Sequence, residues 1–245
     1  MIDAKERNRL ADAHGLVLER IDAARRRAGR DPSHVSLVAV TKTVPPPRVR
    51  AAVEAGLSVF GENRVQEAAG KIPEVSGAKW HLVGPLQTNK ARKAVELFDV
   101  IETVDSVELA RRLDRIVGEL KPDAPFPVLL QVNVDRDPAK VGFDSDDLDG
   151  VLGELGTAAN LRIDGLMTVG RQVATPEAAR PTFVALRQLS ERLRADHQRL
   201  GTQLSMGMTD DFEVAIEEGA TIVRIGRAIF GERPHQHDGG EVDRH

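Results

Sequence analysis

The 245-residue sequence contains no cysteine, no tyrosine and a single tryptophan. Without cysteine the chain has no disulfide, no thiolate-bound metal, no cysteine-ligated iron–sulfur cluster and no cysteine nucleophile. Without tyrosine it lacks the phenol that many enzymes use as a proton donor or acceptor. No run approaches the roughly 18 apolar residues of a membrane helix, and the charged segment Met1–Arg7 has no apolar signal core. We therefore expect a cytoplasmic protein with no membrane partner.

The composition is that of a globular chain of low net charge. Hydrophobic residues make up 41% of the sequence and charged residues 29%, which is typical of a chain that forms a core. The 34 basic and 38 acidic residues give a formal net charge of −4, so the charge balance predicts no nucleic-acid partner. A local cluster falls on a helix predicted from about Asp3, and we expect it to be a solvated helix face: Arg25, Arg26, Arg27 and Arg30.

Short β-branched runs alternate with amphipathic helical stretches, as expected for βα units around a parallel sheet. The predicted strands are Val35–Val40, Leu57–Phe60, Lys79–Val83, Val100–Thr103, Val128–Val132, Arg162–Met167, Gln203–Ser205 and Thr221–Ile225. The predicted helices after the first are Pro47–Ala55, Val65–Ile72, Asn89–Leu97, Val107–Leu120, Asp146–Leu155, Ala178–Leu200, Asp211–Glu218 and one from Arg227.

Eight strand–helix units close a barrel, so we predict an α/β fold: a single (β/α)₈ TIM barrel with an extra N-terminal helix. The barrel domain is expected over residues 1–231, with a disordered polar tail at 232–245. A doubly wound open sheet is the alternative, but it would have fewer strands and a glycine-rich first turn. The first turn here, Val40–Pro47, contains no glycine.

Active-site residues of such barrels lie at the carboxyl ends of the strands. Lys42 follows the first predicted strand, where partial removal from water would favour a neutral amine able to form a Schiff base. A lysine after a strand is also often a plain surface residue. Asn63 follows the second strand and also fits a helix N-cap, and His81 in the apolar third strand also fits a hydrogen-bonded core residue.

Serine and glycine stand at or just after the ends of the seventh and eighth predicted strands, which suits a phosphate site. Ser205 and the main chain of Gly207 and Gly226 are candidate donors in the two loops that often bind phosphate in these barrels. Combined with Lys42, these loops predict a phosphorylated aldehyde as the ligand.

No metal site is predicted. Asp144–Gly150 resembles a calcium loop, but Leu148 occupies a ligand position and Leu155 stands where a glutamate would close the loop. The histidines His235, His237 and His245 lack metal-ligand spacing.

Six segments, in order between about residues 35 and 231, resemble the pyridoxal phosphate homeostasis protein family. They are Leu37–Lys42, Phe60–Glu67, Trp80–Lys90, Gly165–Thr168, Leu204–Asp211 and Val223–Gly226. That family is similar to the N-terminal barrel of alanine racemase standing alone, and it binds pyridoxal 5′-phosphate (PLP).

The resemblance implies roles for individual residues. Lys42 would form the Schiff base with PLP, and Arg224 would lie near the pyridine nitrogen. Ser205, Gly226 and the main chain of Arg227 would bind the phosphate. The residues expected to line the pocket are Asn63, His81 and Met206. Arg227 stands where the family more often has threonine, so its guanidinium would either bind phosphate or point outward.

Three functions remain open on the sequence. The resemblance favours a PLP carrier that is not an enzyme, is a monomer and makes transient contact with apo PLP-dependent enzymes. A PLP-dependent amino-acid racemase is the alternative, but the usual opposing base of alanine racemase is a tyrosine of a partner subunit, and this chain has none. A barrel aldolase or isomerase using Lys42 on a sugar phosphate is the third.

Overall fold

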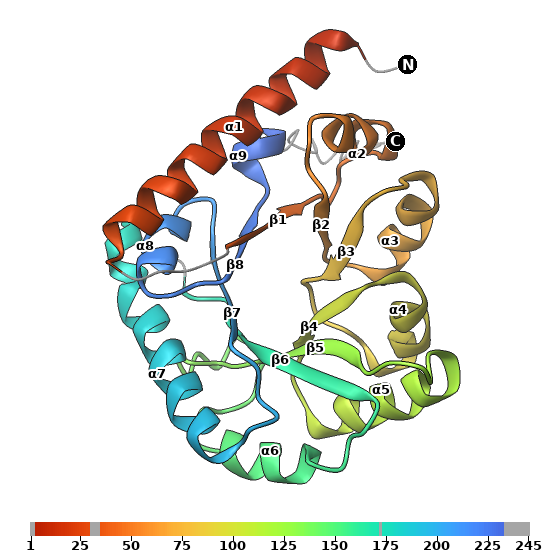
Figure 1. The fold of residues 1–245 in the computed structure, drawn as a ribbon, viewed down its shortest axis with the longest axis vertical. Coiled ribbons are helices and arrows are strands. Elements are labelled where there is room, and N and C mark those ends of the chain that lie inside the picture. Colours follow the sequence, from red (N-terminus) through yellow and green to blue (C-terminus); the bar gives the residue numbers. More distant parts are fainter. Residues whose placement is uncertain (1–2, 30–34, 172, 233–245) are drawn as a thin grey trace, which may run out of the picture.

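The computed structural model describes residues 3–29, 35–171 and 173–232, and it has a closed barrel of eight parallel strands in sequence order (Figure 1). The strands of the described chain are β1 (Ser36–Val40), β2 (Val59–Glu62), β3 (Lys79–Leu82), β4 (Val100–Val104), β5 (Phe126–Gln131), β6 (Leu161–Met167), β7 (Gln203–Met208) and β8 (Ile222–Ile225). Strand β1 pairs with both β2 and β8, which closes the sheet. The predicted (β/α)₈ barrel is confirmed.

The helices form a ring around the barrel (Figure 1). In the described ranges they are α1 (Ala4–Arg27), α2 (Pro46–Glu54), α3 (Val65–Lys71), α4 (Ala91–Leu97), α5 (Val107–Leu120), α6 (Leu148–Leu155), α7 (Arg180–Asp196), α8 (Phe212–Glu217) and α9 (Arg227–Phe230). Helix α5 has the predicted bounds and begins at the cap Ser106, whose hydroxyl accepts from Leu109 N. Its buried side chains recur every three or four residues, which is the spacing of a helix with one face on a core.

The extra N-terminal helix is also present. Helix α1 begins after Asp3, whose carboxylate accepts from Lys5 N, and it buries a stripe formed by Leu10, Val17, Ile21 and Ala24. This stripe packs across α8, α9 and α2 on the outside of the ring (Figure 1). Part of the basic cluster expected to be a solvated face helps to fix the helix, since Arg27 pairs with Glu217 of α8 at 2.8 Å.

Two apolar layers hold the barrel together, because successive strand residues point to opposite faces of the sheet. The inner cluster is small and includes Val38, Leu129 and Met167, whereas the outer cluster joins the strands to the helices and includes Ala39 and Phe60. The interior is therefore filled by side chains, as in other barrels of this size.

Some predicted boundaries differ from the structure. Strand β2 extends to Glu62, two residues beyond the prediction, so Gly61 and Glu62 belong to the sheet and not to the loop after it. Helix α7 ends at Asp196, four residues before the predicted end, and His197 caps it. Except for Glu232, the predicted polar tail lies outside the described residues.

Candidate functional site

The carboxyl ends of β7, β8 and β1 lie side by side and bring together three predicted site segments. Ala39 of β1 pairs with Ile225 of β8, so the turn that carries Lys42 neighbours the Gly226 loop. A Cβ on Gly226 would lie 3.2 Å from Val40 O, which shows how closely the two loops approach. The closed barrel thus places a lysine beside the loop predicted to bind phosphate.

Lys42 is half-buried in a tight turn between β1 and α2. Thr41 N donates to Gly61 O of the neighbouring strand, and Val44 N donates back to Thr41 O at 2.9 Å. Thr43 has a φ of +66°, the left-handed conformation that residues other than glycine rarely adopt. Pro46 then opens α2. The lysine therefore leaves the backbone from a short, constrained turn and not from a long flexible loop.

A polar bridge of four side chains crosses the barrel interior: His81, Glu102, Ser205 and Arg224. His81 Nδ1 lies 2.6 Å from Glu102 Oε1, and Ser205 Oγ donates to Glu102 Oε2 at 2.5 Å. Arg224 NH1 donates to the same hydroxyl at 2.5 Å, and its NH2 donates to Thr168 O at 2.7 Å. Because β4 and β7 are not neighbours in the barrel, the contact between Glu102 and Ser205 passes through its interior.

Charges in this bridge balance one another in a place that water barely reaches. Glu102 is 0% exposed and Arg224 5% exposed. Burial acts to raise the pKa of Glu102, but the hydrogen bond and charge of His81, the charge of Arg224 and the hydrogen bond from Ser205 together outweigh it and lower the pKa. An ionised carboxylate can only accept, so His81 Nδ1 carries the proton and donates, leaving its Nε2 for a ligand.

Burial lowers the pKa of Arg224, and the charges of Glu102 and Asp211 act in the opposite direction. A guanidinium stays protonated even after a sizeable decrease, because its ordinary pKa is so high. The site therefore holds a permanent cation whose position is fixed by Ser205 and Thr168.

Gly207 is required by the local backbone. Its φ is +90°, and a Cβ there would lie 2.5 Å from Ala215 Cβ and 2.9 Å from Phe212 Cα. The end of β7 thus packs directly onto α8, which no other residue type would allow without movement.

The structure places the other predicted residues in different layers. Ser205 lies in the polar bridge with its proton donated to Glu102, so the hydroxyl itself is committed there. Met206 is fully buried in the outer cluster between strands and helices.

Arg227 is exposed, and its guanidinium pairs with Asp210 of the loop after β7. Asn63 is half-buried beside Gly84, where a Cβ would lie 2.3 Å from Asn63 O. Their contacts with a ligand stay predictions.

Glu102 is the functional candidate that the sequence reasoning missed. It stands in the middle of a predicted strand, Val100–Thr103, among apolar and β-branched residues. A charged residue within a strand that is buried on both faces needs a partner, and that signal was available in the sequence. Its partners on β3 and β7, however, become visible only when the barrel is closed.

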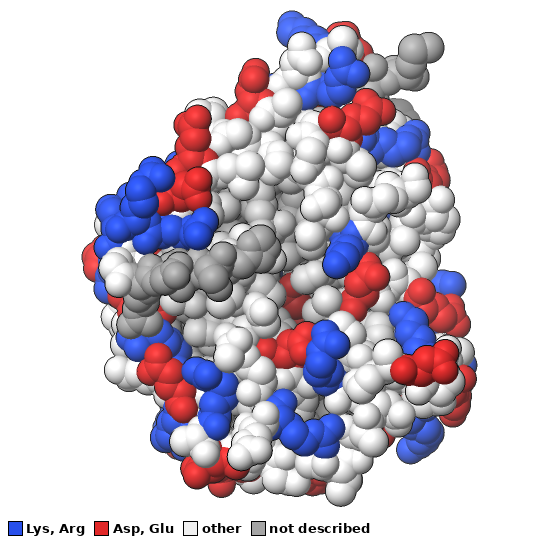
Figure 2. All heavy atoms as spheres, in the orientation of Figure 1, with Lys and Arg blue, Asp and Glu red and all other residues white. Residues whose placement is uncertain are grey.

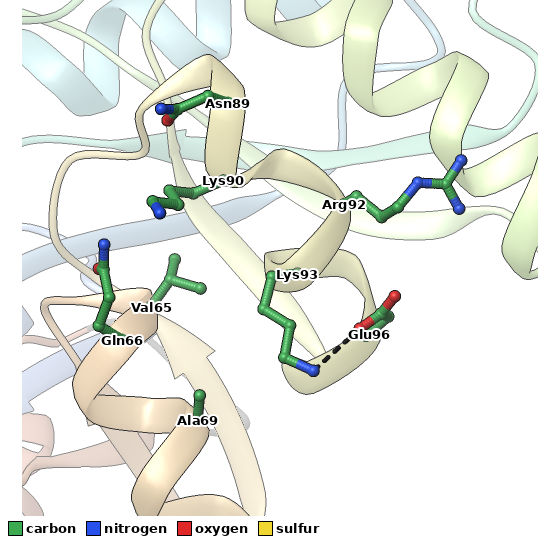
Figure 3. A pocket seen from close by; sticks show the side chains of 8 residues that line it. All are labelled: Val65, Gln66, Ala69, Asn89, Lys90, Arg92, Lys93 and Glu96. Atoms are coloured by element: carbon green, nitrogen blue, oxygen red, sulfur yellow. Dashed lines mark hydrogen bonds and ion pairs between the residues drawn. The ribbon is translucent and has the colours of Figure 1, made fainter.

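Outside the barrel, a groove of about 350 Å³ runs between α3 and α4 (Figure 3). Gln66 and Lys90 point toward one another at one end, and Lys93 pairs with Glu96 at 3.0 Å at the other. None of the predicted site residues lines this groove. On the face shown in Figure 2, acidic and basic side chains are interspersed over the surface.

Within residues 3–29, 35–171 and 173–232 no helix is long and apolar enough to cross a membrane. The same ranges contain no group of three His, Cys, Asp or Glu side chains arranged to hold a metal ion.

The closed parallel barrel, with polar side chains gathered at the carboxyl ends of its strands, places the chain among the (β/α)₈-barrel proteins. The family model for the alanine racemase N-terminal domain matches residues 17–234. A pyridoxal phosphate homeostasis protein of Pseudomonas aeruginosa is 42% identical over 92% of this chain and 96% of its own length, and that of Escherichia coli K12 is 40% identical over 91% and 97%. The chain belongs to this family, in its group of pyridoxal phosphate homeostasis proteins.

Solved structures agree with this assignment. PipY of Synechococcus elongatus PCC7942, solved with PLP bound, is 39% identical, covers 91% of this chain and 100% of its own, and superposes with a TM-score of 0.78. Alanine racemase of Clostridium difficile 630 shares the fold, with a TM-score of 0.63 at 14% identity, and this chain covers 56% of its length.

Proposed function

We propose that this chain binds PLP as a Schiff base of Lys42 and holds it for delivery to other proteins, without being an enzyme. The observation that carries the proposal is the neighbourhood of the Lys42 turn and the Gly226 loop, which follows from the pairing of β1 with β8. One loop offers an amine for the aldehyde and the other offers main-chain donors for the phosphate. The relative PipY, with PLP bound, supports the same ligand.

The residues present fit PLP on chemical grounds. The aldehyde, the phosphate and the pyridine ring each find a group of the matching kind in Lys42, the Gly226–Arg227 main chain and Arg224. The contact between His81 Nδ1 and Glu102 leaves Nε2 of the same ring for a ligand. PLP contributes an aldehyde that reacts reversibly with amines. The protein contributes two neighbouring loops, so the Lys42 turn and the main chain at Gly226 are held close together before the ligand arrives.

The electrostatics of the bridge support a carrier in preference to a racemase. A racemase needs the bound PLP to accept electrons, which a protonated ring nitrogen favours. If Arg224 faces that nitrogen, its permanent charge and donor hydrogens oppose protonation, so the electron-accepting form is disfavoured. The chain also contains no tyrosine to act as a second base.

The racemase alternative rests on one specific observation. His81 and Glu102 form a hydrogen-bonded pair of the kind that moves protons in enzymes, with Nε2 of His81 left unengaged by Glu102. Incubation with PLP and a panel of amino acids in deuterated water separates the two functions. The carrier predicts no α-proton exchange above that of PLP alone, and robust exchange that is lost in His81→Phe would establish an enzyme.

Binding itself is tested by titrating the protein with PLP and following the absorbance band of the Schiff base. We expect saturable binding in the wild type, no band in Lys42→Ala, and an unchanged band in the control Lys90→Ala, which removes a lysine from the outer groove. A third arm uses a sugar phosphate with borohydride, because an aldolase would trap that substrate and not PLP. In this proposal the protein acts as a monomer in the cytoplasm. Delivery of PLP is tested by adding PLP-loaded protein to an apo PLP-dependent enzyme and following the reactivation of that enzyme.

A further inference from the structure

The turn that carries Lys42 is tied to helix α3 through both of the peptide groups that flank the lysine. On the amino side, Thr41 O accepts a hydrogen bond from Lys71 Nζ at 2.7 Å. On the carboxyl side, Thr43 N donates to Glu67 Oε1 at 2.6 Å. The carbonyl belongs to the peptide before Lys42 and the amide to the peptide after it. Helix α3 therefore fixes the orientation of the backbone at Lys42 itself.

These two contacts come from one cluster, here called the α3 clamp. It consists of Glu67 and Lys71 of α3 together with Glu62, the last residue of β2. Lys71 is 3% exposed, and its ammonium contacts Glu62 Oε1, Glu67 Oε1 at 3.1 Å, and Thr41 O. An ammonium has three hydrogens, so all of its donors are used. Glu62, which is 0% exposed, also accepts from Thr41 Oγ1 at 2.5 Å. The clamp thus holds both the main chain and a side chain of the turn.

Burying the charged groups of the clamp is an energetically unfavourable way to stabilise the fold. Removing an ammonium and a carboxylate from water is unfavourable, and well-packed apolar side chains of similar volume often stabilise a fold equally well. Burial raises the pKa of Glu62, while the contacts with Lys71 and Thr41 act to lower it. Thr43 adds a further cost, because its φ of +66° is unfavourable for a residue with a Cβ. The bond from Thr43 N to Glu67 and the bond from its hydroxyl to Lys42 O hold that conformation.

We propose that the α3 clamp is a positioning device for the Schiff-base lysine. It sets the direction in which the Lys42 side chain leaves the backbone, and so the alignment of its amine with an aldehyde held by the phosphate loops. Glu62, Glu67 and Lys71 are positioning residues, since they act through the turn and not on the ligand. This inference rests on the proposed Schiff base of Lys42 and adds to it the residues that prepare the lysine.

The test measures how fast PLP becomes trapped on Lys42 by borohydride, as a function of PLP concentration. Misplacement of a reacting group lowers the limiting rate at saturating ligand, whereas loss of binding contacts raises the half-saturating concentration. Glu67→Ala removes the acceptor of Thr43 N, and Glu67→Gln keeps an amide oxygen at the same place. Lys71→Met removes the donor to Thr41 O with little change in volume. Arg180→Met, which breaks an ion-pair cluster of α7 and α8, serves as a control for general loss of stability.

We expect Glu67→Ala and Lys71→Met to lower the limiting rate by about tenfold with an unchanged half-saturating concentration. Glu67→Gln should recover most of the rate, and Arg180→Met should retain it. If Lys71→Met fails to fold, the Glu67 pair decides alone, because Glu67 is partly exposed. Wild-type limiting rates in a folded Glu67→Ala would overturn the clamp while leaving the Schiff base intact. Absence of trapping in the wild type would instead overturn the proposed function, and the clamp with it.

Discussion

Glu102 and Arg224 are joined through a single hydroxyl: Ser205 Oγ donates to the carboxylate and accepts from the guanidinium, each at 2.5 Å. The two charged residues come from β4 and β8, and both are buried. Neither would be tolerated there alone, because an uncompensated charge in a barrel interior is strongly unfavourable. Glu102 is therefore the counterion of Arg224, the cation that is expected beside the pyridine ring.

Replacing that counterion should damage both the fold and the site. We expect Glu102→Gln to lower the free energy of unfolding by about 3 kcal/mol, since Arg224 then keeps its charge without a carboxylate. It should also raise the half-saturating PLP concentration, because Arg224 and His81 lose their fixed positions. Urea unfolding and a PLP titration measure the two effects. The matched variant Glu119→Gln breaks an exposed pair with Arg92 and should cost less than about 1 kcal/mol. Equal stability of the two variants would contradict the account.

Gly207 should be far less replaceable than a glycine on a helix surface. Gly207→Ala places a Cβ within 2.5 Å of Ala215 Cβ at a φ of +90°, so we expect a loss of several kcal/mol in thermal or urea unfolding. Gly150→Ala in α6 meets nothing within 4 Å and should stabilise the protein by about 0.5 to 1 kcal/mol. A neutral Gly207→Ala would mean that β7 and α8 are less tightly packed than described.

Substitution of Arg227 distinguishes a phosphate held by the Arg227 side chain from one held by main-chain groups. Its guanidinium is engaged by Asp210 and lies 3.4 Å from Glu232, outside the polar bridge. We therefore expect Arg227→Ala to change the half-saturating PLP concentration by less than about twofold, which corresponds to under roughly 0.5 kcal/mol. A tenfold weakening would show that the side chain leaves Asp210 to bind the phosphate.

The attachment of α1 should depend on pH through Glu6. Hydrogen bonds from Arg9 and Arg48, opposed by partial burial, lower the pKa of Glu6 from 4.5 to about 2. A depressed pKa means that the ionised form is favoured in the folded state, so the stabilisation is complete above pH 4.5 and is lost as the pH falls toward 2.

The group is partly exposed, and the expected loss in Glu6→Gln at neutral pH is about 1 kcal/mol or less. The difference in unfolding free energy between wild type and Glu6→Gln should therefore shrink as urea titrations move from neutral pH to acid. A difference that is constant across this range would exclude an ionic origin.

The sequence was sufficient for the architecture because each strand and helix carries its own local pattern. Short β-branched runs between amphipathic helical stretches placed the strands in order, and the bounds of α5 were predicted as the structure has them. Strand β7 runs three residues past its predicted end, to Met208. Strand β2 is displaced by two residues at each end, because Gly61 and Glu62 look like turn residues but continue the ladder with β3. Such a boundary depends on pairing with a neighbouring strand, which the local sequence does not predict.

The candidate site was predictable only in part. Lys42, Gly226 and Arg224 follow from strand ends and from the family resemblance, and the structure brings their segments together. The partners that hold them were not predictable, since Glu102 meets Ser205 across the barrel and Lys71 reaches the turn from the side of a helix. Contacts between residues so far apart in the chain exist only in the closed fold.

The most direct test of the central claim is to saturate the protein with PLP, reduce it with borohydride and locate the label by peptide mass mapping. A Schiff base at Lys42 predicts one phosphopyridoxyl group per chain, on Lys42, and none on the Lys42→Ala variant. A label spread over surface lysines, or retained in full by Lys42→Ala, would contradict it.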